Sequence, residues 1–182
     1  MSKSNTTENG STSSLEESDR LTSLDFLNAE HSTLLKAELV KKLAQDSEYL
    51  ALKEKAETLH NQFNQLFLQY SQAYDNPKKE AYKSMGRVIR TMEAERNKFN
   101  VQAMQTNLSQ KKEKNDEILK KWEKKLAENP QLSPNELAQE QCETRIAFAE
   151  VKASHQSLIR AEVLSELFSP PKEWEALLLA SG

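Results

Sequence analysis

The sequence predicts an all-α protein whose centre is an elongated antiparallel, coiled-coil-like helical hairpin. Ala, Glu, Lys, Arg and Leu make up about half of the 182 residues, a composition typical of coiled coils and long helices. Only three glycines occur, and Val, Ile and Thr nowhere alternate with polar residues over the length of a strand. Two strict heptad patterns flank one short proline-containing turn, which favours two helices packed against each other.

Residues 1–21 are expected to form a disordered tail. The segment is dominated by Ser, Thr, Asn and Glu and contains no aromatic side chain. It therefore cannot bury enough apolar surface to offset the entropy lost on ordering. Three interpretations stay open for this tail: a plain solvating terminus, a phosphorylatable segment, or an unfolded leader read by an export machine.

The first helix is expected to begin near Thr22, where a hydroxyl N-cap precedes the acidic Asp25. Its apolar positions drift at first and then settle into a strict heptad pattern, which predicts a seam against a partner helix. One continuous helix with a change of register near Asp46 is preferred over two separate helices. The seam residues are Tyr49, Leu52, Ala56, Leu59, Phe63, Leu66, Tyr70 and Ala73.

The first helix is expected to end at Asn76–Pro77, because proline disfavours the α conformation in the residue before it and suits the start of a new helix. The second helix is predicted from Pro77 to about Glu128. Only this short turn separates the two seams, so the helices are expected to form a hairpin over residues 22–129. The second seam consists of Tyr82, Met85, Ile89, Met92, Arg96, Phe99, Ala103 and Thr106.

Residues 133–182 are expected to hold a third long helix and a short C-terminal helix that pack on the hairpin. Ser133-Pro134-Asn135-Glu136 is a capping box with proline at the first helical position, a specific signal for a helix start. The third helix is predicted to reach about Phe168, with an apolar arc that widens towards its end. Ser169-Pro170-Pro171 then breaks it, and Lys172–Ala180 can form the short helix.

The net charge of −3 conceals a segmental pattern. Residues 1–77 carry 7 basic and 12 acidic side chains, residues 78–133 carry 14 and 8, and residues 134–182 carry 4 and 8. A basic segment between acidic ones is typical either of a nucleic-acid surface or of a helix that folds against acidic neighbours. The second interpretation is favoured, because no aromatic residues are interleaved with the lysines as single-strand binding requires.

The residues that could carry catalysis are few and scattered. The histidines are His31, His60 and His155, and the three glycines are isolated, so no phosphate-binding loop is present. Glu57-x-x-His60 matches the spacing found in di-iron bundles, but it occurs once, and the second helix has no histidine. His155 is expected to be a packing residue and Cys142 an inert thiol. We therefore predict no enzyme activity, catalytic residue, cofactor or metal.

The short C-terminal helix carries Trp174, Leu177 and Leu178 on one face, and it is too short to be stable alone. Docking on its own bundle is favoured, because the preceding proline pair is expected to reverse the chain and return the helix onto the apolar arc around Leu164 and Phe168. The alternative is docking in a groove of another protein. The three apolar residues of the helix are thus candidates for partner binding.

Arg96 and Gly86 stand out in the second helix. Arg96 occupies a seam position, where a long polar side chain weakens packing and can fix the register or the choice of partner. Its guanidinium could instead reach solvent along the apolar surface. Gly86 costs about 1 kcal/mol relative to alanine inside a helix, which suggests a close backbone approach or a bend.

The leading functional hypothesis is a non-enzymatic scaffold or adaptor that binds proteins through helix–helix contacts. Two helices alone leave apolar surface uncovered, so a larger or homo-oligomeric assembly is expected. One alternative is a secretion-associated protein: an export stalk, a chaperone or an exported substrate. The hairpin architecture resembles the helical-hairpin stalk proteins of type III export ATPases. The second alternative is a nucleic-acid binder that uses the basic middle helix.

Cysteine usage and hydropathy predict the compartment. The single Cys142 excludes an internal disulfide, and the polar start of the chain lacks the apolar segment of a secretory signal. The longest apolar runs are far shorter than the roughly 20 residues that span a bilayer. We therefore expect a cytoplasmic protein, or one exported by a route independent of a signal peptide, with no membrane span.

Overall fold

A computed structural model describes Leu24 and residues 27–181, with side chains to Leu178 in the last helix. The predicted tail, residues 1–21, lies outside the described residues. Within them the chain is all-α, as predicted, and contains no strand. The helices are α2 (Ala29–Leu43), α3 (Ser47–Gln72), α4 (Asp75–Asn97), α5 (Val101–Glu128), α6 (Pro134–Glu166) and α7 (Lys172–Ser181).

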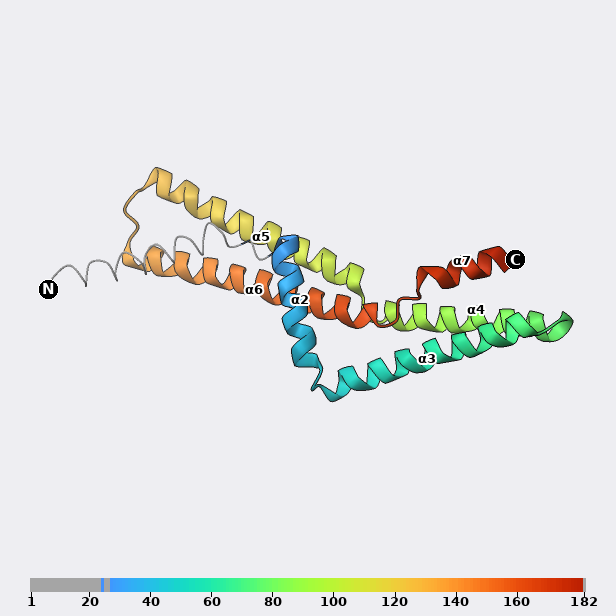
Figure 1. Ribbon diagram of the computed structural model, residues 1–182. Helices are drawn as coiled ribbons and strands as arrows, with labels where there is room; N and C mark the ends of the chain where they lie inside the picture. The colour runs from blue at the N-terminus through green and yellow to red at the C-terminus, as the bar shows by residue number, and fades with distance from the viewer. Residues whose placement is uncertain (1–23, 25–26, 182) are drawn as a thin grey trace.

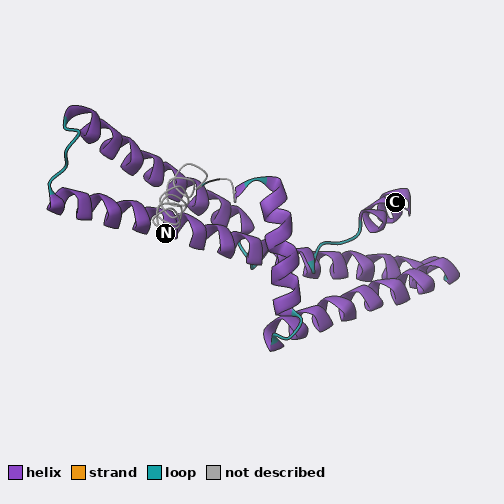
Figure 2. Cartoon of the chain, turned by 60° about the vertical axis from the view of Figure 1, so that its left-hand side comes forward, coloured by secondary structure: helices purple, strands orange, loops and turns teal. Residues whose placement is uncertain are grey.

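Two antiparallel hairpins lie end to end and give the molecule its elongated shape (Figure 1). One hairpin pairs α3 with α4, and the other pairs α5 with α6. The shorter α2 crosses α6 near the middle of the molecule, as the turned view confirms (Figure 2). The expectation of an elongated all-α fold with a hairpin, a long third helix and a short C-terminal helix is confirmed.

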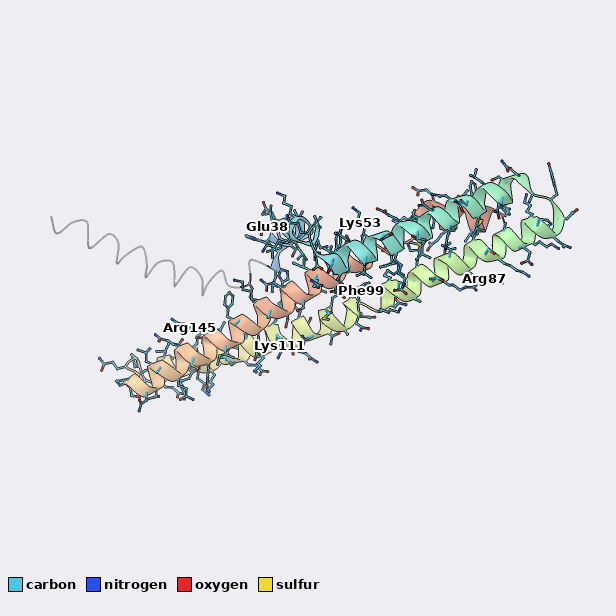
Figure 3. All side chains as sticks on the ribbon, turned by 90° about the horizontal axis from the view of Figure 1, so that it is seen from below. Glu38, Lys53, Arg87, Phe99, Lys111 and Arg145 are labelled. Atoms are coloured by element: carbon cyan, nitrogen blue, oxygen red, sulfur yellow. The ribbon has the colours of Figure 1, made fainter. Side chains whose placement is uncertain are left out.

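The predicted second helix is two helices, because the chain breaks at Lys98–Asn100. Asn100 has a φ of 52°, the left-handed conformation that asparagine tolerates better than most residues. The Phe99 ring packs on Phe168 at the end of α6, with centroids 6.2 Å apart. Figure 3 shows Phe99 where the two hairpins meet. The expectation of one helix from Pro77 to Glu128 is therefore wrong.

The predicted first helix is also divided. α2 ends at Leu43, and the Asp46 side chain caps a new helix by accepting a hydrogen bond of 2.9 Å from the Glu48 backbone N–H. The expectation of one continuous helix with a change of register is therefore wrong, because the chain forms two helices separated near Asp46. As a result the first hairpin consists of α3 and α4 alone, and α2 packs on α6 instead of extending the hairpin.

The apolar core has two parts. The core of the α3–α4 hairpin contains the predicted seam residues Phe63, Met85, Ile89 and Met92, of which Met92 is fully buried. The second cluster holds the two hairpins together at the middle of the molecule, where α2 and α3 meet α6. Its buried members are Leu43, Tyr49, Ile159, Val163 and Leu164.

The α5–α6 hairpin combines the buried apolar side chains of Trp122, Ala147 and Val151 with several polar contacts. Lys111 and Lys114 lie 3.4 and 3.5 Å from a carboxylate oxygen of Glu150, and Lys121 lies 3.2 Å from one of Glu143. The buried Trp122 donates its indole N–H to the same Glu143 carboxylate at 2.8 Å. The basic helix therefore folds against an acidic neighbour, as the favoured interpretation of the charge pattern predicts.

Several local signals in the sequence are confirmed. Ser133 accepts a hydrogen bond from the Glu136 backbone N–H at 3.2 Å and donates one to the Glu136 carboxylate at 3.0 Å, so the capping box forms. The break predicted at Asn76–Pro77 lies slightly earlier, at Ala73–Tyr74, so Asn76 and Pro77 belong to the first turn of α4. Gly86 has open space where a Cβ would stand, so the expected close backbone approach is absent there.

Candidate functional site: the surface that holds the C-terminal helix

The chain itself dictates that α7 is separate from α6. The Ser169-Pro170-Pro171 linker cannot continue a helix, because proline lacks the N–H and crowds the preceding turn. A new helix starts directly after the linker, where the backbone N–H of Trp174 donates to the Pro171 carbonyl oxygen at 3.0 Å. Glu173 and Glu175 lie in the first turn, where acidic side chains suit the helix dipole. A helix of ten residues still needs tertiary contacts to persist.

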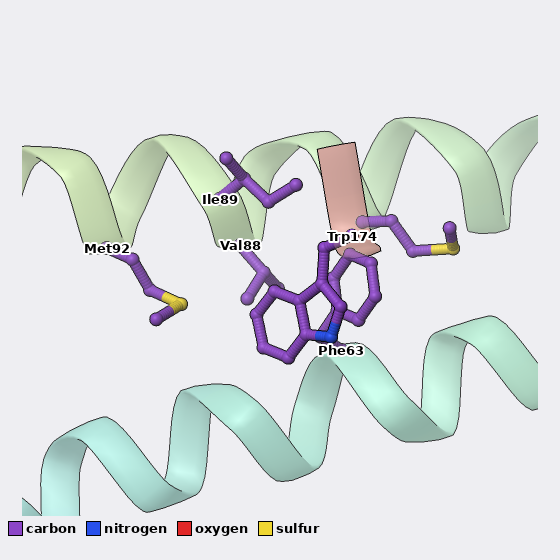
Figure 4. Packing of buried hydrophobic residues seen from close by; sticks show 6 residues of the cluster. Phe63, Val88, Ile89, Met92 and Trp174 are labelled. Carbon is purple, nitrogen blue, oxygen red and sulfur yellow. The ribbon is translucent and has the colours of Figure 1, made fainter. Parts of the chain in front are cut away.

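Trp174 provides the main tertiary contact of α7. Its indole stacks on the Phe63 ring of α3, with centroids 3.9 Å apart and an angle of 11° between the planes (Figure 4). The His60 ring meets the same indole edge-on at 4.9 Å. Only 8% of Trp174 stays exposed, so the indole is part of the core of the α3–α4 hairpin.

We call the apolar face beneath α7 the α7-docking surface. The C-terminal half of α7 adds one polar contact to it, because the Tyr82 hydroxyl donates to the Leu178 carbonyl oxygen at 3.2 Å. The Leu177 and Leu178 side chains are half-buried. The α7-docking surface is the apolar cluster that Trp174 joins: buried Phe63, Met85, Val88 and Ile89, and the partly buried α3 residues Leu59, Leu66, Phe67 and Tyr70 packed against them.

The structure corrects the expected position of α7. The linker does not return the helix onto α6; α7 continues past the end of α6 and lies beside the other hairpin (Figures 1 and 2). The apolar arc of α6 is already covered, since Leu164 belongs to the central cluster and Phe168 is fully buried. Docking of the helix on its own chain is confirmed, and α7 thereby connects α6 with the α3–α4 hairpin.

Arg96 lies away from the α7-docking surface. The half-buried side chain lines an open hollow of about 930 Å³ at the junction of α4 and α5, shared with Asn97, Asn100 and Ser165. The structure therefore brings the three α7 candidates together on one helix and separates Arg96 from them. A role of Arg96 in partner choice stays a prediction.

Two further features were not expected from the sequence: the ring of His60 and the ring of Phe67 beside the same cluster. The sequence of α3 does contain a signal for this wider apolar face. Phe67 lies outside the heptad seam of α3, so the apolar stripe of this helix is wider than one partner helix needs. A stripe of that width predicts a second neighbour, and α7 occupies that position.

The structure also places His155 and Cys142, which the sequence analysis considered. His155 is buried and shares a hydrogen bond of 3.2 Å with the Ser32 hydroxyl, as expected of a packing histidine. Burial lowers its pKa. Cys142 is exposed. Within the described residues, no three His, Cys, Asp or Glu side chains converge to hold a metal ion.

The fold and this surface define an elongated all-α protein with two hairpins bridged by its C-terminal helix. No protein-family model, curated protein or solved structure matches the chain. Among the helices described, none has the length and apolar character that crossing a bilayer requires.

Proposed function

We propose that the protein is a non-enzymatic scaffold or adaptor that binds other proteins through helix–helix contacts. The observation that carries the proposal is the docking of α7 on the α3–α4 hairpin. A short amphipathic helix lies on an apolar face of the α3–α4 hairpin and is anchored by one indole, the arrangement in which helical peptides bind receptor proteins. The same physical chemistry would serve a helix from a partner.

The elongated shape supports this proposal, because it separates contact regions that a partner assembly could use. At the tip of the α3–α4 hairpin, Leu68 is 59% and Tyr74 is 82% exposed. At the far end of the other hairpin, Leu126 and Leu137 are 43% and 48% exposed. Large exposed apolar side chains at opposite ends of a rod are suited to contacts with different proteins.

The charge distribution favours protein partners over nucleic acid. Three lysines of α5 are engaged by carboxylates of α6: Lys111 and Lys114 by Glu150, and Lys121 by Glu143. A lysine that is paired in this way contributes less to the release of counterions from phosphates, which drives nucleic-acid binding. The proposed partners are therefore proteins, and a second copy of the chain is among them.

Site-specific photocrosslinking tests the proposal. A photoreactive phenylalanine analogue replaces Tyr74 or Leu137 in the full chain, which is expressed in the cells that naturally make it. We expect light-dependent covalent adducts with proteins at one or both positions. Samples kept in the dark control for non-specific adducts, and nuclease treatment identifies nucleic acid. Labelled chain recovered only as free monomer, or only in nuclease-sensitive adducts, contradicts the proposal.

A further inference from the structure

The helix α7 is only partly buried on the α7-docking surface. Of its described side chains, Trp174 is the one that is buried, while Leu177 and Leu178 are half-buried. The contacts of the helix are with α3 and α4, through the Phe63 and His60 rings and the Tyr82 hydroxyl. An isolated helix of ten residues is marginal in water, so part of the docking energy is spent on ordering α7 itself.

The α7-docking surface is covered only in part by its present occupant. Leu59, Leu66, Phe67 and Tyr70 pack against the Trp174 cluster, yet all four stay partly exposed while α7 is in place. These side chains extend along three turns of α3. Tyr70 at their end lies 6.3 Å from the ring of Tyr82, whose hydroxyl bonds the Leu178 carbonyl oxygen of α7. A helix with more apolar side chains on its inner face would remove more of this area from water.

The linker permits α7 to leave without disturbing the helices around it. Ser169-Pro170-Pro171 holds no helix, and α6 ends in contacts of its own, with Phe168 buried against Phe99. So short a linker keeps α7 at a high effective concentration near its seat. A competing helix must therefore bind more tightly than α7 does, which makes α7 a built-in competitor.

From these observations we propose that the α7-docking surface is a binding site for an amphipathic helix of another protein. The partner helix presents Trp, Leu and Leu at positions i, i+3 and i+4, as α7 does with Trp174, Leu177 and Leu178, and it has four or more turns with a further leucine on the same face. This inference rests on the proposed scaffold function and names the class of partner. Binding of that helix displaces α7.

A labelled peptide tests the proposal on the full chain. The probe repeats residues 171–178 and continues for about two helical turns with leucine on the same face and Glu and Lys elsewhere. Anisotropy measures its affinity for the wild-type chain and for Trp174→Ala, in which the competing anchor is gone. We expect the variant to bind at least about tenfold more tightly, because the competitor at millimolar effective concentration is weakened.

A matched control peptide carries alanine in place of the tryptophan, and we expect its affinity to be at least about tenfold lower than that of the probe. Equal affinity of the two peptides overturns the proposal, as does equal binding to wild type and variant or no binding to a folded variant. If Trp174→Ala does not fold, Leu177→Ala/Leu178→Ala replaces it, because these two side chains are only half-buried.

Exchange of α7 between two copies is the competing outcome. Sedimentation of the wild-type chain over a wide concentration range detects it as a dimer that Trp174→Ala abolishes, and that result overturns the proposal in favour of a second copy as occupant. The crosslinking and peptide experiments together distinguish failure of the scaffold function from failure of this surface. Protein adducts at Tyr74 or Leu137 without peptide binding support the scaffold and refute this surface. Peptide binding without protein adducts contradicts the scaffold proposal as tested at the hairpin ends and still supports a helix-binding surface.

Discussion

At the scale of single residues, Trp174 connects two distant parts of the chain. Burial of one large aromatic side chain is worth roughly 1.5–3 kcal/mol, and stacking on another ring adds about 1 kcal/mol. The indole of Trp174 has both contributions, because it is 8% exposed and lies flat on Phe63. Much of the docking free energy of α7 therefore depends on this one side chain.

Replacement of Trp174 tests that dependence. We expect Trp174→Ala to lower the free energy of unfolding by about 2–3 kcal/mol, because the stacked indole is lost and α7 is released. Urea denaturation followed by circular dichroism measures the change. Leu137→Ala is the control at a half-exposed position, with an expected loss below about 0.5 kcal/mol. An unchanged unfolding midpoint for Trp174→Ala would show that α7 is not docked in solution.

Gly86 offers a stabilising change. The residue lies within α4, and a Cβ at this position would meet no atom within 4 Å. We expect Gly86→Ala to raise the free energy of unfolding by about 0.5–1 kcal/mol, because alanine restricts the unfolded chain and favours the helix. Thermal denaturation checks the direction of the shift.

The matched control for Gly86 lies on the same helix. Ala94→Gly changes an exposed position of α4 in the opposite sense and should lower the free energy of unfolding by about 1 kcal/mol. A loss of stability in Gly86→Ala would show that the helix needs glycine at this point for bending.

His155 makes stability depend on pH. Burial lowers its pKa below the ordinary value of 6.5, an effect that the nearby Glu162 carboxylate partly opposes. The unfolded state therefore takes up the proton at higher pH than the folded state does. The contribution of His155 to stability is complete above about pH 6.5 and is lost as the pH falls towards the lowered pKa of the folded state.

Replacement of His155 by glutamine isolates this contribution, because glutamine keeps a hydrogen-bonding group near Ser32 but does not titrate. Urea denaturation at several pH values between about 7.5 and 5 gives the slope of stability against pH. We expect a shallower slope for His155→Gln than for wild type. The variant keeps His31 and His60, so the difference in slope comes from His155. Identical slopes would contradict the assignment.

At the scale of helices, the two hairpins have different kinds of interface. The α3–α4 seam is apolar, whereas α5 and α6 combine the buried Trp122, Ala147 and Val151 with part-exposed ion pairs, which contribute little to stability. Asn115 of α5 is 2% exposed, and its amide nitrogen has no hydrogen-bond partner among the described residues. A buried polar group without a partner costs about 1–3 kcal/mol. The α5–α6 hairpin is therefore expected to be the less stable of the two.

Replacement of Asn115 tests the cost of the buried amide. Asn115→Leu puts an apolar side chain of similar length in its place, and we expect the free energy of unfolding to rise by about 1–2 kcal/mol. Amide hydrogen exchange should slow in α5 and α6 and stay unchanged in α3 and α4. Asn115→Asp, which buries a charge, is the control with the opposite expectation. A destabilised Asn115→Leu would show that the amide is satisfied in solution.

At the scale of the whole molecule, the end-to-end arrangement determines the shape. α4 and α5 have 23 and 28 residues and follow one another along the long axis (Figure 1). At about 1.5 Å per residue they measure roughly 34 and 42 Å. The core is correspondingly thin, and the surface available to partners is large for the mass of the chain.

Small-angle X-ray scattering checks this shape in solution. A compact chain of 182 residues would have a radius of gyration of about 16 Å. We expect a value clearly above it, with the asymmetric distance distribution of a rod. A symmetric distribution at the compact value would show that the hairpins fold onto each other instead of lying end to end.

The sequence by itself determined the helical class and the signals that depend on local physical chemistry. The capping box at Ser133, the helix break just before Asn76–Pro77 and the linker Ser169-Pro170-Pro171 depend on a few residues each, so the sequence indicates them without a fold. The heptad pattern also identified Phe63 and Met92 as core residues. Part of the candidate site was therefore predictable, namely the apolar face of α7 and its need to dock.

Only the tertiary structure decided which helices pair. A heptad pattern shows that a face is covered, but apolar contacts are not directional, so it does not specify the partner. The break at Asn100 is locally unfavourable and persists because it lets Phe99 pack on Phe168 and gives α5 a new partner in α6. This arrangement also explains why Trp174 stacks on Phe63. The apolar face at the end of α6 is covered by the central cluster, whereas the wide apolar face of α3 still has room for α7.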